Sequence, residues 1–137
     1  MSDAGHALQA ALYTLLVNDP SVLAILGGPR VYDSVPREAT YPLVAFGERE
    51  GRDWSTGTEA GDEHFLVLRA WSRGEGKRDC AEILAVVRSV LEAASLSPDG
   101  HHLVNLRFVD ADIRRDRDGA TWRGSARFRA VTEPELA

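Results

Sequence analysis

The stretch of sequence that decides the fold is E-H-F-L-V-L-R-A-W-S-R, residues 63–73. Side chains of an extended chain alternate between two faces, and both faces of this stretch are mostly apolar. The first face has Phe65, Val67, Arg69 and Trp71, and the second has Leu66, Leu68 and Ala70. A strand that is apolar on both faces is typical of the middle of a sheet. We therefore predict a central strand at residues 63–73.

A helix is predicted directly after this strand, beyond the Gly74-Glu75-Gly76 break. Apolar residues recur here at intervals of three and four, which places them along one face of a helix. They are Cys80, Ile83, Leu84, Val87, Val90, Leu91 and Ala94. Cys80 is the only cysteine of the chain, so no disulfide can form within it. Its position on the apolar face predicts a buried, unreactive thiol.

The chain before the central strand is predicted to hold two helical segments and two strands. The first helix begins at Ser2 or Asp3, either of which can cap it, and ends at Asn18-Asp19-Pro20. A short apolar helical turn at residues 21–26 ends at Gly27-Gly28, because glycine readily adopts the left-handed conformation that terminates helices. Strands are then predicted at residues 31–35 and 43–48.

A polar connection leads from there to the central strand. Residues 50–62 are rich in Gly, Thr, Asp and Glu, and a connection of this length is usually mobile or functional. Trp54 is the one large aromatic residue in it. Its ring either folds back onto the domain or anchors in a pocket of another protein, because tryptophan is enriched at interface hot spots. Arg52, Asp53 and Trp54 are therefore candidate contact residues.

A β-hairpin is predicted near the C-terminus. A turn at residues 97–100 leads into a strand at residues 103–109. Two further strands are joined at residues 116–119, where Gly119 suits the positive φ of a bulged hairpin. A short free tail is expected after about residue 132.

The last strand has one apolar face and one face that carries Arg123, Arg127 and Arg129. Alternation along a strand separates these two sets of side chains. Three interpretations of the arginines stay open. They bind nucleic acid, they pair with carboxylates of a neighbouring subunit, or they are simply exposed to solvent.

These elements predict a single α+β domain spanning residues 1–137. It is a two-layer sandwich, in which a twisted, mostly antiparallel sheet of about five strands has two amphipathic helices on one face. With 16 basic and 21 acidic side chains the net charge is −5, which argues against non-specific attraction to a nucleic-acid backbone. Residues 107–129 nonetheless have seven Arg and four Asp. The last strands are therefore a basic part of an acidic protein.

Catalytic motifs are not found in the sequence. It has no glycine loop followed by Lys-Ser/Thr, no G-x-S-x-G elbow and no H-E-x-x-H helix. His101 and His102 are adjacent, so on a strand they point to opposite faces and cannot readily share a metal. No apolar run approaches the roughly 20 residues that cross a bilayer. We expect no catalytic residues, no cofactor, no metal site and no membrane partner.

A metal-dependent nuclease is the enzyme class that the residues come nearest to. Such a site uses clustered carboxylates, commonly with a lysine nearby. The candidates are Glu48, Glu50, Asp62, Glu63 and Lys77. Because Lys77 lies beyond the next predicted strand, we interpret the four acids as groups that keep the hairpin and its loop soluble.

Six segments stand in a distinctive order along the chain. They are A-L-Q-A-A-L-Y-T-L-L (7–16), G-G-P-R-V-Y-D-S-V-P (27–36), Y-P-L-V-A-F-G-E (41–48), R-D-W-S-T (52–56), the central strand (63–73) and D-R-D-G-A-T-W-R-G-S-A-R-F-R-A-V-T-E-P (116–134). As an ordered set they resemble the tail-completion, or tail terminator, family of long-tailed phages and phage-derived gene transfer agents. The resemblance covers residues 7–134.

The resemblance implies a structural protein without catalytic residues. It implies a subunit of a ring, usually a hexamer, that sits on the completed tail tube, stops its polymerisation and presents a surface for joining the DNA-filled head. The implied partners are further copies of the chain, the tail tube protein and a head–tail connector or adaptor, with DNA only passing through the lumen. The implied location is the head-proximal end of the tail of a virion or phage-like particle, assembled in the bacterial cytoplasm.

Two other functions stay open beside this one: a small oligomeric binding module and a metal-dependent nuclease. For a ring subunit, the side chains expected at subunit or partner contacts are Arg52, Asp53, Trp54, Arg123, Arg127 and Arg129. A ring needs two different surfaces of each copy to meet, and the acidic body and the basic last strands are candidates for them.

Overall fold

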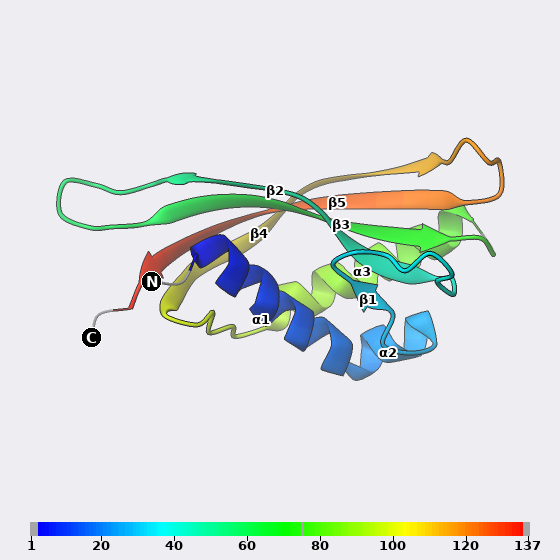
Figure 1. Cartoon of the computed structure of the whole chain (residues 1–137), viewed down its shortest axis with the longest axis horizontal. Helices are drawn as coiled ribbons and strands as arrows, with labels where there is room; N and C mark the ends of the chain where they lie inside the picture. The colour runs from blue at the N-terminus through cyan, green and yellow to red at the C-terminus, as the bar shows by residue number, and fades with distance from the viewer. Residues whose placement is uncertain (1–2, 75, 136–137) are drawn as a thin grey trace.

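The protein has two layers, a sheet and a set of helices packed on one of its faces (Figure 1). The structure is a computed structural model and describes residues 3–74 and 76–135. In the described part, the strands are β1 (Val31–Tyr32), β2 (Leu43–Asp53), β3 (Asp62–Ser72), β4 (His101–Arg115) and β5 (Trp122–Pro134), and the helices are α1 (Ala4–Asn18), α2 (Pro20–Leu26) and α3 (Lys77–Ala93). The predicted α+β class is confirmed.

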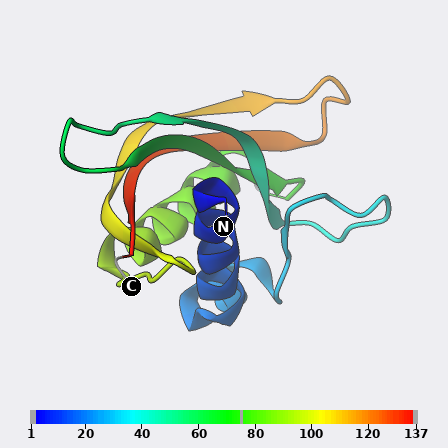
Figure 2. The ribbon, with the colours of Figure 1, turned by 60° about the vertical axis from the view of Figure 1, so that its left-hand side comes forward.

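The sheet has the strand order β1-β2-β3-β5-β4 and is antiparallel except between β1 and β2. β3 therefore lies in the middle, as the sequence predicts. Its residues Leu66, Leu68 and Ala70 are buried in the core beneath the sheet. The side chains between them point to the opposite face, over which no helix lies (Figure 2). We call this the helix-free face.

The helix predicted after β3 is α3, and its apolar face packs against β3, β4 and β5. Cys80, Ile83 and Leu91 are among its buried residues. The helix approaches β5 closely at Gly124, where an added Cβ would lie 2.8 Å from Cδ1 of Leu84 and 3.2 Å from Cβ of Cys80. A glycine in β5 thus sets the distance between the two layers.

The N-terminal helices begin and end where their capping residues predict. Asp3 accepts a hydrogen bond of 3.1 Å from the amide of Gly5 at the start of α1, whereas the alternative cap, Ser2, lies outside the described residues. Asp19 caps α2, and Gly27 ends it with a φ of 79°. None of the described helices is by itself long and apolar enough to cross a bilayer; α1 and α2 satisfy such a criterion only as a pair, which is bent by 71°.

The polar connection is shorter than the sequence predicts, because β2 continues to Asp53 and β3 begins at Asp62. Residues 50–53 are paired with residues 62–65, so the loop is reduced to residues 54–61. The sequence stretch Glu48–Asp53 has no apolar alternation, and an ion pair between Arg52 and Glu63 joins the two strands here. In Figure 1 this β2–β3 hairpin projects at one end of the molecule's long axis.

Three other strand boundaries also differ from the prediction. β1 is only Val31–Tyr32 instead of residues 31–35. β4 is one strand of 15 residues from His101 to Arg115, kept in register with β5 across two irregularities, where two separate strands were expected. β5 runs to Pro134 and pairs there with His101, so the tail expected after residue 132 begins later. Gly119 has a φ of 73°, as the hairpin prediction requires.

Candidate interaction surface

Arginine and aromatic side chains gather on the helix-free face of the sheet. On β5, residues 124, 126 and 128 point into the core, so Arg123, Arg127 and Arg129 point to the helix-free face. Each of the three guanidinium groups lies near an aromatic ring, at 5.7 Å from Trp71, 5.6 Å from Phe65 and 5.3 Å from Trp54, respectively. Arginine in such a position covers apolar surface and keeps its donors available to a partner.

A buried carboxylate, Glu63, organises the base of the β2–β3 hairpin. Its side chain is only 3% exposed, and its two oxygens accept from Nε of Arg52 and, at 2.5 Å, from Nε of Arg129. Burial would raise the pKa of Glu63, but the hydrogen bonds and charges of Arg52 and Arg129 outweigh it and hold that pKa below its usual value of 4.5. The carboxylate is therefore ionised and ties β2 to β5 through β3.

Trp54 joins this cluster, which we define as Arg52, Trp54, Glu63 and Arg129. The guanidinium carbon of Arg52 lies 6.0 Å from the centre of the Trp54 ring, on which Arg129 also packs. The indole is thus folded back against the domain, yet it remains 49% exposed. In the isolated chain the Trp54 ring is thus folded back onto the domain, which is one of the two predicted alternatives. The exposed half of the ring remains available for contact with another protein.

Asp53 belongs to a different surface from its neighbours Arg52 and Trp54. It accepts from the amide of Ser55 at 3.1 Å and from the hydroxyl of Ser55 at 2.6 Å. These hydrogen bonds lower the pKa of Asp53. Across the hairpin Asp53 pairs in register with Asp62, and both line a hollow of about 440 Å³ beside the first residues of α1. The hollow extends to Arg52 of the Glu63 cluster, but the side chain of Asp53 lies on the other face of β2.

Arg123 and Arg127 lie farther along β5 and line a second hollow, of about 400 Å³, on the helix-free face. Arg127 is 3.5 Å from a carboxylate oxygen of Asp110 on β4. Within the described residues Arg123 makes no ion pair, and the residue in register with it on β4 is Arg114. Arg69 also lines this hollow. The six predicted contact residues therefore fall into three places: the Glu63 cluster, the hollow around Asp53 and the hollow around Arg123.

Sequence reasoning missed Glu63 and Arg114 as members of these surfaces. Glu63 was interpreted as a solubilising acid, and the structure shows that it is instead the buried partner of two arginines. The signal lies in the register: Arg52 and Arg129 both stand beside Glu63 only when β2, β3 and β5 are aligned. Arg114 becomes significant for the same reason, because only its pairing places it opposite Arg123.

Two of the four acids considered for a nuclease, Glu48 and Glu63, are engaged by arginines. Glu48 accepts from Nη2 of Arg69 at 2.8 Å, Glu63 is held by its two arginines, and Lys77 begins α3. Across residues 3–74 and 76–135, no group of three or more His, Cys, Asp or Glu side chains is placed to hold a metal ion. His101 and His102 follow each other on β4, and Nδ1 of His101 lies 2.8 Å from the carbonyl of Asp99.

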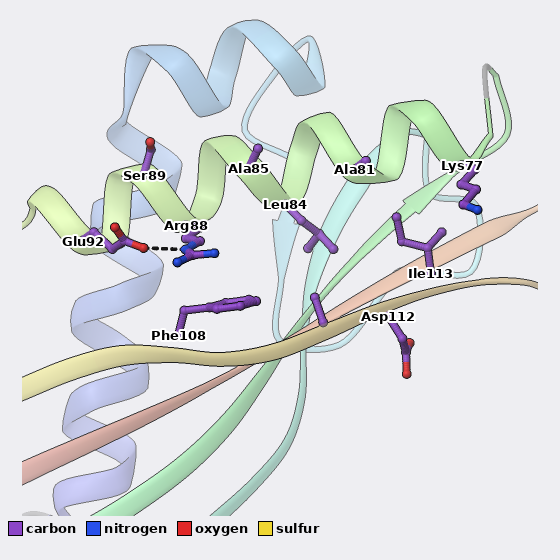
Figure 3. Close-up of a pocket in the computed structure, with 11 residues that line it drawn as sticks. Lys77, Ala81, Leu84, Ala85, Arg88, Ser89, Glu92, Phe108, Asp112 and Ile113 are labelled. Carbon is purple, nitrogen blue, oxygen red and sulfur yellow. Dashed lines mark hydrogen bonds and ion pairs between the residues drawn. The ribbon is translucent and has the colours of Figure 1, made fainter.

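A further hollow, of about 670 Å³, lies between α3 and β4 (Figure 3). Its middle is lined by Leu84, Phe108 and Ile113, and Arg88 packs over the ring of Phe108 at 4.1 Å while it pairs with Glu92. Asp112 points away from the helix in Figure 3, so its carboxylate does not converge with these groups. The hollow is an apolar groove with charges at its ends, and nothing in it pairs a nucleophile with a base.

The thiol of Cys80 lines none of the hollows described above. Cys80 is fully buried, its Sγ is 3.6 Å from the carbonyl oxygen of Ala70, and burial raises its pKa. The predicted core position of Cys80 is confirmed. A thiol of raised pKa in the core is a poor nucleophile.

Comparison with known proteins identifies the family. The model of the family "Tail completion protein gp17" matches residues 10–133. A chain in the virion of a native gene transfer agent particle is 31% identical, with a TM-score of 0.87 over 97% of this chain and 99% of that chain. The gp17 protein of bacteriophage SPP1 is 23% identical, with a TM-score of 0.64 over 93% of this chain and 89% of that one, and shows the same fold.

A curated protein is also similar over nearly the whole chain. It is the protein of Cupriavidus pinatubonensis named phosphoglucosamine mutase, 29% identical over 134 residues. The chain covers 98% of its own length in this match but spans only 29% of that protein. The name of that longer protein therefore carries no activity over to this chain. By its family model and by its likeness to a virion component, the chain belongs to the tail completion protein gp17 family, a family of structural proteins of phage-type tails.

Proposed function

We propose that this chain is a tail terminator. Six copies form a ring on the end of the completed tail tube, where the ring stops polymerisation of the tube and offers the surface to which the DNA-filled head is joined. The observation that carries the proposal is the near end-to-end likeness to a chain of the native gene transfer agent virion, with a TM-score of 0.87. Because both chains are matched almost completely, the likeness extends over the whole fold.

The distribution of charge supports assembly through different surfaces of each copy. A closed ring needs a heterologous contact, in which one patch of a subunit meets another patch of the next. The acidic hollow around Asp53 and the basic hollow around Arg123 are two such patches. We further propose that Arg52, Asp53, Trp54, Arg123, Arg127 and Arg129 contribute to contacts with neighbouring copies or with the adjoining tail and head proteins.

The proposal names three partners and a place. The ring contacts the tail tube protein on one side and a head–tail connector or adaptor on the other, and DNA only passes through its lumen. It occupies the head-proximal end of the tail after assembly in the bacterial cytoplasm. Catalysis has no part in this function, and no residue is assigned a chemical step.

Deletion of the gene in the particle-producing bacterium tests the function. We expect tails of irregular, often excessive length and heads without tails, measured by electron microscopy of negatively stained lysates, and restoration by the wild-type gene supplied in trans. In parallel, light scattering of the purified protein, alone and with purified tail tubes, is expected to give a species of six chains. Tails of normal length joined to heads in the deletion strain would overturn the proposal.

A further inference from the structure

The sheet has three places where like charges face each other directly across neighbouring strands. In one of them, Arg107 of β4 opposite Arg129 of β5, Arg129 is already paired with the buried Glu63. In the other two, Asp53 of β2 is in register with Asp62 of β3, and Arg114 of β4 is in register with Arg123 of β5. Like charges placed directly opposite in an antiparallel pair are destabilising. Of these two pairs one is acidic and the other basic, so their charges are complementary.

The two pairs lie at opposite ends and on opposite faces of the sheet. The Asp53/Asp62 pair closes the β2–β3 hairpin, and the Arg114/Arg123 pair lies toward the turn of the β4–β5 hairpin; Figure 1 shows these hairpins pointing in opposite directions along the long axis. The acidic pair faces the helix side, since its hollow is shared with Ala4 and Gly5 of α1. The basic pair faces the helix-free side.

The basic hollow has donors that its own chain leaves unsatisfied. Arg114 reaches only Asp112, at 3.7 Å, and its side chain is 71% exposed. Arg123 has no ion pair within the described residues, and the buried Nε of Arg69 has no hydrogen-bond acceptor there. Glu48, Asp112 and Asp110 pair with Arg69, Arg114 and Arg127, so of the four arginines that line the hollow only Arg123 is left without an ion pair among the described residues.

The acidic hollow has the complementary excess. It is lined by Asp3, Asp53 and Asp62, by His64, whose pKa is lowered chiefly by burial, and by two arginines, of which Arg52 is held by Glu63. The other, Arg49, donates to the carbonyl of Gly5 at 2.8 Å and lies 3.9 Å from a carboxylate oxygen of Asp3. The Asp53/Asp62 pair therefore has no basic side chain of its own chain bound to it among the described residues.

We infer that the Arg114/Arg123 pair of one copy inserts into the acidic hollow around Asp53 and Asp62 of the next copy. Contact between opposite ends and opposite faces is heterologous, so successive copies overlap and can close into a ring. The long arginine side chains reach across the junction, and each like-charge pair gains opposite charges from the neighbouring copy on assembly. The inference rests on the proposed ring and identifies the surfaces that build it.

Two complementary charge reversals test the contact. Asp62→Lys places a positive charge in the acidic hollow. Arg114→Glu places a negative charge beside Arg123 in the basic pair. Each variant alone is expected to assemble at a protein concentration higher than wild type by on the order of tenfold or more, because like charges then meet at every junction. An equimolar mixture is expected to recover most of the loss, since alternating copies restore opposite charges at each junction and an even-membered ring closes.

The measurement is light scattering over a concentration series, on the protein alone and on purified tail tubes, with native mass spectrometry of the mixture to count the two variants. Arg78→Glu is the matched control, because Arg78 is an exposed arginine of α3 that pairs only with Glu82 among the described residues. We expect this control to assemble like wild type. A thermal melt confirms that each variant is folded, and Arg114→Gln is expected to melt no lower than wild type because it relieves the repulsion with Arg123.

The outcomes separate the inference from the function on which it rests. Unimpaired assembly of both variants, or impaired variants that do not rescue each other, would overturn the inference and leave the ring in place. Failure of the wild-type protein to form a ring, both alone and on tail tubes, would overturn the proposed function and the inference together.

Discussion

Glu63 shows how a single carboxylate connects stability with the candidate surface. Its ordinary pKa of 4.5 is lowered in the folded chain by Arg52 and Arg129. Because the pKa of this carboxyl is lower in the folded chain than in the unfolded chain, the ionised carboxylate stabilises the fold at pH values above the ordinary pKa. This stabilisation is lost as the pH falls through the pKa of the folded chain. The same two arginines pack on the ring of Trp54. Loss of the negative charge of Glu63 is therefore also expected to loosen the exposed indole.

Replacement of Glu63 by Gln is expected to lower the melting temperature by several degrees at pH 7. The two arginines then lose their counter-charge while the shape of the side chain is kept. The difference from wild type should shrink toward zero well below pH 4.5, where the wild-type carboxyl is protonated as well. Thermal unfolding followed by circular dichroism at both pH values measures this.

Glu50→Gln is the control for that experiment. Glu50 lies on β2 beside Phe65 and is exposed, so its replacement should leave the melting temperature nearly unchanged. An equal effect of Glu63→Gln at neutral and acidic pH would show that packing, and not charge, holds the hairpin base together.

At the scale of elements, the spacing of α3 from the sheet depends on Gly124 of β5. A side chain there would meet Leu84 and Cys80 of the helix at less than normal contact distance. Overpacking a close contact forces helix and strand apart, and such changes commonly cost about 1–3 kcal/mol. The same movement would displace Leu84, which lines the groove between α3 and β4.

Gly124→Val is therefore expected to reduce the free energy of unfolding by about 1–3 kcal/mol, measured by urea denaturation. Gly57→Ala in the hairpin loop is the control, because an added Cβ at Gly57 meets nothing within 4 Å. A Gly124→Val protein as stable as wild type would mean that the two layers can separate at no cost.

The elements that sequence reasoning placed well are those with a strong apolar period. The residues of α3 from Cys80 onward and the alternation of β3 are of this kind, and the observed bounds differ from the predicted ones by one or two residues. The end of β2 has no such period. Its strand pairing is stabilised by Arg52 and Glu63, which are 11 residues apart, and a contact of that kind is visible only after the register is known.

At the scale of the whole molecule, Cys80 reports on the integrity of both layers. Its thiol lies between α3 and the sheet, fully buried, with a pKa raised by burial. It can meet a reagent only when helix and sheet separate. We expect almost no reaction with a disulfide reagent at pH 8 under native conditions, and complete reaction over the same urea range in which circular dichroism detects unfolding. Rapid labelling without urea would show that α3 opens independently.

The candidate surface was predictable as a set of residue types but not as an arrangement. Alternation along β5 is enough to place Arg123, Arg127 and Arg129 on one face, and the structure agrees. Alternation alone does not reveal that Arg129 is neutralised by Glu63 or that Arg123 faces Arg114. Those facts depend on the order β2-β3-β5-β4, in which sequence neighbours are separated and distant strands are joined.

One face of β3 and β5 packs in the core, and the other face bears the charged surface. This limits how the length of these strands can vary in evolution. An insertion or deletion of one residue within β3 or β5 would exchange the two faces. It would bring Arg127 into the place of Phe128 and expose apolar residues where charges now stand. Related chains can therefore change their contacts by substitution along these strands, whereas changes of length are confined to the hairpin turns at residues 54–61 and 116–121. We therefore expect the alternation that builds the core to preserve the spacing of these charges among related chains.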